Sequence, residues 1–153
     1  MSQVDIETLM PQARDLWNKN DQLSNVNSYH IHVYFQEKHA SEPKAEVLAR
    51  YIGEKFATDV VSVSRTDAGG PHLQPNWAIK IKTAGFSNII PWLHINGENS
   101  GGLSILVHPQ TGNKRSDHLF HSLWLGTPIG INENHYNRPG VASPQLPPSP
   151  APG

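Results

Sequence analysis

Histidine is the residue type in this sequence that most clearly could do chemistry. The chain has nine histidines among 153 residues and no cysteine. Imidazole is the commonest metal ligand in proteins, and it titrates near neutral pH. Without thiolates, a transition metal would be held by imidazole and carboxylate groups, which suits iron, manganese, zinc or copper. Six histidines lie in or beside apolar or glycine- and proline-rich segments: His30, His32, His72, His108, His118 and His121.

Two of these histidines lie in the stretch NSYHIHVYF, residues 27–35. Its β-branched and aromatic residues are typical of a strand. His30 and His32 are two residues apart, so both imidazoles would point to the same face of a sheet. Such a pair is commonly no more than two polar residues on a solvated face. The strand alone therefore leaves open whether the pair binds a metal.

The elements around this strand predict a fold class. A helix-like pattern over 4–19 is interrupted by Pro11, and a second helix is expected from 41, with Ser41 as N-cap and Pro43 in its first turn. The expected strands are 29–35, 59–65, 76–82 and 103–108, with a short helix or irregular apolar segment at 86–95. The order βαββαβ predicts an α+β, ferredoxin-like fold with an antiparallel sheet and helices on one face.

Three regions are expected along the chain. Residues 1–27 form an N-terminal extension, 28–136 form the domain, and 137–153 are a proline-rich tail that we expect to be disordered. The net charge is −1 and the pI is near 6.7, which gives no electrostatic footprint for nucleic acid or an anionic membrane. No secretory signal or long apolar run is present. We expect a cytoplasmic protein that acts on small molecules.

The predicted topology brings a third histidine to the pair. In a ferredoxin-like sheet the first strand lies between the third and fourth and is antiparallel to both. Ile31, Val33 and Phe35 would then face the helices, and the alternate residues would face away. The end of the fourth strand lies beside the start of the first, which places His108 near His30.

The segment after the fourth strand can add further groups to this face. It carries His118 and His121, three residues apart, which is about one helical turn. The simplest interpretation of this segment is a helix start capped by Asp117. A carboxylate ligand is harder to assign, because neither Asp117 nor Glu98 has decisive spacing. The GGPH stretch that ends at His72 is either a tight turn or a loop that presents a donor to substrate.

Five short motifs in this order resemble the DOPA 4,5-dioxygenase family of aromatic ring-cleaving enzymes. They are YHIHVYF (29–35), GPH (70–72), IIPWL (89–93), LSILVHPQTG (103–112) and DHLFHSLWLG (117–126). The resemblance implies a ferredoxin-like fold and extradiol cleavage of a catechol such as DOPA, at the 4,5 bond, with O2. It also implies Fe(II) as cofactor, with zinc or another divalent metal as an alternative in purified protein.

On this hypothesis each candidate residue has an expected role. The metal set is His30, His32 and His108, with His118 as a replacement for one of them. An acid–base group outside the metal set would be His72, His118 or His121. Tyr34 and His72 would contact the substrate.

Two other functions compete with this hypothesis. A non-catalytic ferredoxin-like module could bind a small aromatic ligand, or dimerise, through its open sheet face. A homodimer is also compatible with the dioxygenase hypothesis. A two-histidine phosphoesterase would need paired His-x-Thr/Ser motifs, and the first candidate here is His-Ile-His. The sequence therefore disfavours the phosphoesterase.

Overall fold

The computed structural model describes residues 5–19, 26–97 and 102–137. They fall into two units, one containing α1 and the other containing all the remaining elements. In chain order, with η for a 3-10 helix, the elements are α1 (Ile6–Lys19), β1 (Ser28–Tyr34), α2 (Ser41–Lys55), β2 (Val60–Thr66), β3 (Asn76–Lys82), η2 (Thr83–Gly85), α3 (Phe86–Asn96), β4 (Ile105–Gln110), α4 (Lys114–Leu119), β5 (Leu123–Leu125) and η3 (Glu133–Asn137). None of the described helices is long and apolar enough to pass through a lipid bilayer.

The second unit is built on a five-stranded antiparallel sheet. The strand order is β2-β3-β1-β4-β5, so β1 lies at the centre between β3 and β4. The first four strands, with α2 and α3, follow the βαββαβ order, which confirms the predicted ferredoxin-like α+β fold. The short strand β5 was not predicted, because three residues are too few to give a periodic pattern.

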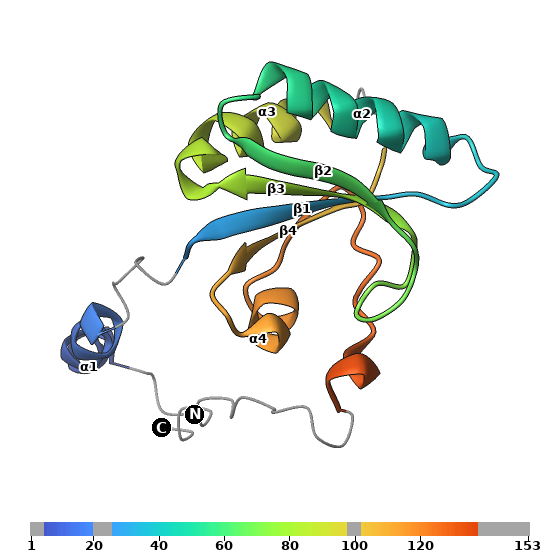
Figure 1. Ribbon diagram of the computed structural model, residues 1–153. Helices are drawn as coiled ribbons and strands as arrows, with labels where there is room; N and C mark the ends of the chain where they lie inside the picture. Colours follow the sequence, from blue (N-terminus) through green and yellow to red (C-terminus); the bar gives the residue numbers. More distant parts are fainter. Residues whose placement is uncertain (1–4, 20–25, 98–101, 138–153) are drawn as a thin grey trace. The chain divides into compact units, whose positions relative to one another are not determined.

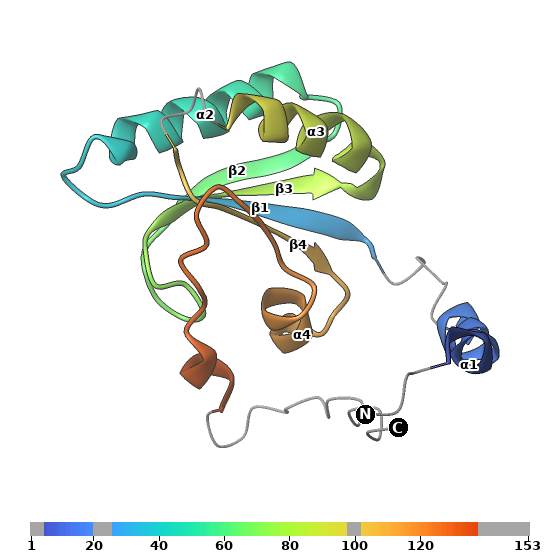
Figure 2. The ribbon, with the colours of Figure 1, turned by 180° about the vertical axis from the view of Figure 1, so that it is seen from behind.

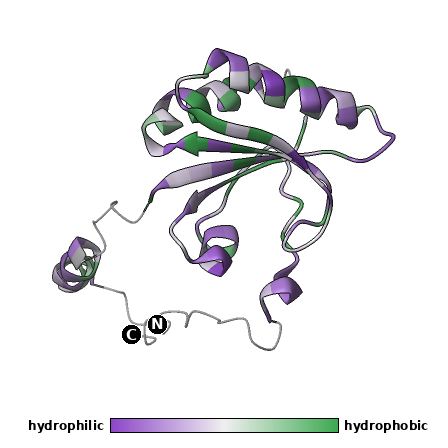
Figure 3. Cartoon of the chain, viewed as in Figure 1, coloured by the Kyte–Doolittle hydropathy of each residue, from purple (hydrophilic) through white to green (hydrophobic). Residues whose placement is uncertain are grey.

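The two faces of the sheet are covered in different ways. Figure 1 shows α2 and α3 packed together on one face of the sheet. The view from behind in Figure 2 shows α4 and the chain that follows it on the opposite side. Figure 3 shows that α4 and η3 are mostly hydrophilic on this side. The second face is therefore lined by polar segments of the same domain.

Alternation along β1 separates the core from this second face. Ile31, Val33 and Phe35 are buried in the hydrophobic core with residues of α2 and α3, as predicted. On the opposite face, His32 is 4% exposed and Tyr34 is 2% exposed. Around His32 and Tyr34 this face is covered by the chain after β4, which was expected to reach it, whereas Ser64 of β2 stays exposed on the same face.

Two details of the helices differ from the sequence-based expectations. Pro11 does not interrupt α1, which runs for 14 residues through it. A proline inside a helix removes one backbone hydrogen bond and crowds the carbonyl of the preceding turn, which can kink the helix without ending it. Ser41 is the first helical residue of α2 and not its N-cap, which is Ala40. The Ser41 hydroxyl instead accepts a hydrogen bond from the Gln36 N–H.

The predicted tail beyond residue 137 lies outside the described residues.

Candidate metal centre

Strand register brings three histidines together at the middle of the second face. His30 of β1 is paired directly with His108 of β4, as the topology predicted. His32 lies two residues further along β1, and its ring centroid is 5.1 Å from that of His108. Nitrogen atoms of His30, His32 and His108 all lie within 4.8 Å of one another. The structure thus gathers the three residues predicted as the metal set.

Two more histidines reach the same place from outside the sheet. His72 comes from the loop between β2 and β3, and His118 comes from α4. Together with His32 they form a second group whose nitrogen atoms lie within 4.8 Å of one another. His32 is shared by both groups. The cluster therefore offers two overlapping sets of three imidazoles.

The hydrogen bonds of His32 and His108 determine which ring nitrogen can bind a metal. The Nδ1 of His32 lies 2.9 Å from the Asn76 Oδ1, and the Nδ1 of His108 lies 2.9 Å from the Pro109 carbonyl oxygen. Both partners are acceptors, so in the neutral rings each Nδ1 carries the proton. Each Nε2 then has a free lone pair. A histidine that binds a metal through one ring nitrogen usually donates the N–H of its other ring nitrogen to such an acceptor.

The two Nε2 atoms point at each other across a distance of 3.0 Å. Two lone pairs at this distance repel unless a proton or a cation lies between them or beside them. Two nitrogens bound at about 2.1 Å and at right angles around one metal lie about 3 Å apart. Five imidazoles without a free carboxylate form a donor set suited to iron, zinc or copper. These residues therefore fit a divalent transition metal.

Phenol groups hold the two histidines that come from outside the sheet. The Tyr34 hydroxyl lies 2.7 Å from the Nδ1 of His72, and the Tyr136 hydroxyl lies 2.8 Å from the Nδ1 of His118. The Nδ1 of His118 also lies 2.7 Å from the Lys114 carbonyl oxygen, so this nitrogen donates. Burial raises the pKa of Tyr136 to about 12, so the phenol keeps its proton at neutral pH. In both histidines the Nε2 is left for another partner.

Burial lowers the pKa of the clustered imidazoles. The pKa of His30 falls to about 4, because of burial first and the charge of Lys80 second. Burial also lowers the pKa of His72 to about 4 and that of His108 to about 3. The pKa of His32 falls well below its ordinary value of 6.5 for the same reason. All four rings are therefore neutral at pH 7, which is the form that binds a metal.

These lowered pKa values predict an acid-sensitive fold in the metal-free protein. The unfolded histidines take up protons below their ordinary pKa of 6.5, whereas the folded ones stay neutral down to about pH 4. Between these values the unfolded state binds more protons, so stability falls as the pH falls. We expect the unfolding temperature of chelator-treated protein to be steady above pH 7 and to decrease from about pH 6.5 towards pH 4. His72→Gln should make the decrease shallower. A constant unfolding temperature down to pH 4.5 would contradict the buried, neutral cluster.

A cavity of about 710 Å³ opens beside the cluster. Such volumes fall within the range of roughly 300–1,000 Å³ typical of small-molecule sites. His30, His32, His72, His108 and His118 all line it. A small molecule in this cavity would therefore lie against the same imidazoles that could hold a metal.

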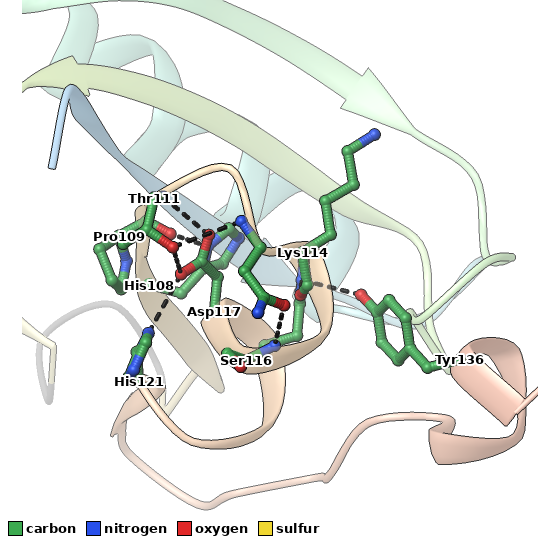
Figure 4. A network of polar contacts seen from close by, with 10 residues as sticks. His108, Pro109, Thr111, Lys114, Ser116, Asp117, His121 and Tyr136 are labelled. Carbon is green, nitrogen blue, oxygen red and sulfur yellow. Dashed lines mark hydrogen bonds and ion pairs between the residues drawn. The ribbon is translucent and has the colours of Figure 1, made fainter. Parts of the chain in front are cut away.

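The remaining predicted site residues lie at the edge of this arrangement. Asp117 is not the N-cap of α4, since Asn113 caps it by accepting the Ser116 N–H. Figure 4 shows the Asp117 carboxylate directed at Thr111, with His121 bonded to it from the other side. The side chain of His121 is 47% exposed and does not line the cavity. Its catalytic role stays a prediction.

Several residues of the site were not predicted. Asn76 is fully buried and orients His32, and His135 and Tyr136 line the cavity from η3. The sequence gives little sign of them, because a short 3-10 helix has no periodic pattern. For Asn76, a polar residue at the start of an apolar alternating strand is the available signal.

Replacing Asn76 should weaken the metal site without removing a ligand. Asn76→Leu keeps a similar side-chain size but leaves the Nδ1 of His32 without its acceptor. Loss of such an outer partner typically costs about 10–100-fold in metal affinity. We expect a weakening in this range when metal binding is measured by competition with a chelator. Asn27→Leu, which makes the same change at an exposed residue of the cavity lining, is the control. Unchanged affinity in Asn76→Leu would remove His32 from the ligand set.

The sequence of this chain is similar to those of a known protein family. The family described as Dopa 4,5-dioxygenase matches residues 29–135. A DOPA 4,5-dioxygenase of Amanita muscaria is 29% identical over 115 residues, which cover 71% of this chain and 49% of that protein. An uncharacterized 21.2 kDa protein of Botryotinia fuckeliana is 27% identical over 114 residues, 69% of this chain and 61% of that protein. The chain thus spans less than two thirds of the length of each curated relative.

A solved structure agrees with these matches. The crystal structure of a candidate dioxygenase from Nostoc punctiforme is similar with a TM-score of 0.63 and 30% sequence identity. The similarity covers 76% of this chain and 96% of that one. The family match includes all but the first residue of β1, the whole of β4 and α4, and every histidine of the cluster. The chain belongs to the Dopa 4,5-dioxygenase family.

Proposed function

We propose that this protein is an Fe(II)-dependent extradiol dioxygenase that cleaves the ring of a catechol, such as DOPA at its 4,5 bond, with O2. Membership of a dioxygenase family supports an oxygenase over a non-catalytic binding module. The observation that carries the proposal is the pair of facing Nε2 atoms of His32 and His108, 3.0 Å apart beside a cavity of about 710 Å³.

The residues proposed to hold the metal are His30, His32 and His108, with His118 as the alternative to one of them. A bound Fe(II) would bring the catechol oxygens and O2 into one coordination sphere. Asn76 and the Pro109 carbonyl keep the two facing rings in the tautomer that binds metal. Zinc or another divalent ion is an alternative occupant of the same donor set.

The proposed acid–base group is His72. A catechol must lose a hydroxyl proton for its ring to be attacked by O2, and a neutral imidazole near the ring can take it. His72 lines the cavity, and Tyr34 holds its Nδ1, so Nε2 is the nitrogen left for substrate. His118 is the second candidate for this role. Tyr34 would act through His72, because its hydroxyl is already engaged there.

Oxygen uptake tests this proposal. Protein stripped with a chelator and reloaded with Fe(II) under anaerobic conditions should consume one O2 for each catechol supplied. The product should be yellow and should contain an aldehyde, as expected for cleavage next to the diol. Zinc-loaded protein is the matched control, because zinc has no redox chemistry. Lack of oxygen uptake by the Fe(II)-loaded protein with every catechol supplied would refute the proposal.

Location in the cytoplasm and dimerisation stay predictions.

A further inference from the structure

Positively charged side chains outnumber negatively charged ones in the lining of the cavity. Two lysines, Lys80 of β3 and Lys114 of α4, line it together with one carboxylate, that of Asp117. Asp117 is 3% exposed. Lys114 is exposed, and Figure 4 shows its side chain extending away from Asp117. A molecule in the cavity would therefore meet ammonium groups more readily than a carboxylate.

Both oxygens of Asp117 already have partners. Its Oδ2 accepts the Thr111 N–H at 2.9 Å, and its Oδ1 accepts the Thr111 hydroxyl at 2.7 Å. The Nδ1 of His121 also lies 3.1 Å from Oδ1. No other carboxylate is present among the described residues that line the cavity. A substrate ammonium group would thus find no free anionic partner there.

Lys80, unlike Asp117, is not held by a charged partner among the described residues. None of the ion pairs between described residues involves it. It lies directly opposite His30 in the β1–β3 register, so the two side chains share one face of the sheet about 5 Å apart at their Cβ atoms. Its charge is close enough to lower the pKa of His30, although burial has the larger effect. Lys80 is therefore a cation beside the cluster that is available to a ligand.

The sheet also leaves room for a ring between the cluster and β2. Ala78 is the neighbour of His32 on β3, and Ser64 is the neighbour of Ala78 on β2. Both small side chains line the cavity. A catechol ring that faces His32 can lie over Ala78, and a short substituent on the ring can then reach Lys80 along the same strand.

We propose that Lys80 binds a carboxylate of the substrate, and that the preferred substrates are catechols that carry a carboxylate and no ammonium group. This inference rests on the proposed function and narrows its substrate class. The ammonium of an amino acid such as DOPA would lie near Lys80 and Lys114 without an anionic partner. A simple dihydroxyphenyl carboxylate avoids this repulsion and keeps the ion pair.

Four catechols separate the two charges. They are 3-(3,4-dihydroxyphenyl)propionate with a carboxylate alone, L-DOPA with both charges, dopamine with an ammonium alone, and 4-ethylcatechol with neither. Anaerobic calorimetry with Fe(II)-loaded protein measures binding without turnover. We expect the propionate to bind about tenfold more tightly than 4-ethylcatechol, and about two- to fivefold more tightly than L-DOPA. Dopamine should bind most weakly. Equal or tighter binding of L-DOPA, or no binding of any of the four, overturns the inference.

A charge-removing variant tests the role of Lys80 itself. Lys80→Gln should reduce the roughly tenfold preference for the propionate over 4-ethylcatechol to near unity. Lys44→Gln makes the same change of charge on α2, on the other side of the sheet, and should keep the preference. If Lys80→Gln keeps the preference, the assignment of Lys80 is wrong.

Failure of the proposed charge preference and failure of the proposed dioxygenase activity would give different results. If the calorimetric ranking holds but no catechol supports oxygen uptake, the charge selectivity stands and the dioxygenase is refuted. If the catechols are cleaved but L-DOPA has the higher kcat/KM, the dioxygenase stands and the inference is overturned.

Discussion

His32→Ala should abolish both metal binding and ring cleavage. His32 belongs to both groups of three imidazoles, so neither set remains complete without it. Because loss of an outer partner already costs about 10–100-fold in metal affinity, loss of a ligand should cost more than about 100-fold. We expect less than a tenth of the iron found in the unaltered protein, measured by atomic absorption after desalting. Turnover of catechol should be undetectable.

Two controls make this result specific to the metal. His94→Ala removes a histidine from the exposed side of α3 and should keep full iron content. His32→Gln fills more of the buried space than alanine does, so it guards against loss of metal through a disturbed fold. Circular dichroism should report the same secondary structure for all of these proteins. Stoichiometric iron in both His32 variants would show that the metal lies elsewhere.

His72→Ala should keep the metal and lose the reaction. If His30, His32 and His108 hold the ion, His72 is free to take a proton from the substrate, and general acid–base catalysis typically contributes 10²–10⁴-fold. We expect full iron content and a kcat at least about 100-fold lower. Tyr34→Phe removes only the hydroxyl that holds the Nδ1 of His72, so its kcat should fall less.

The iron content of His72→Ala also decides between the two groups of histidines. Loss of iron in this variant, with iron retained in His30→Ala, would assign the metal to His32, His72 and His118. Full iron content with unchanged kcat and KM would show that His72 has no part in catalysis. The GGPH segment would then serve only as a turn, in which Gly70 has a positive φ of 56°.

The position of the three sheet histidines was predictable because it depends on period and topology alone. Alternation placed His30 and His32 on one face, and the βαββαβ order made β4 the neighbour of β1. The pairing of His30 with His108 follows directly. The core side of β1 was predictable for the same reason, since Ile31, Val33 and Phe35 alternate with the histidines.

The chain after β4 was harder to predict. Short segments such as β5 and η3 have too few residues to show a period, so the contributions of His135 and Tyr136 could not be foreseen. Asp117 stands at the start of the segment DHLFH and resembles an N-cap, but its carboxylate instead accepts hydrogen bonds from Thr111. That contact depends on how α4 folds back towards β4, which local sequence does not determine.

The most direct test of the central claim is the fate of labelled oxygen in the reaction of the Fe(II)-loaded protein. With ¹⁸O2 and a catechol, the extradiol dioxygenase proposed here should place both oxygen atoms in one ring-opened product that contains an aldehyde and a carboxylate. Mass spectrometry after rapid borohydride reduction, which keeps the aldehyde oxygen as an alcohol, should show both labels, and His32→Ala should give no product. A product with one label or none, or a dicarboxylate without an aldehyde, would contradict the account.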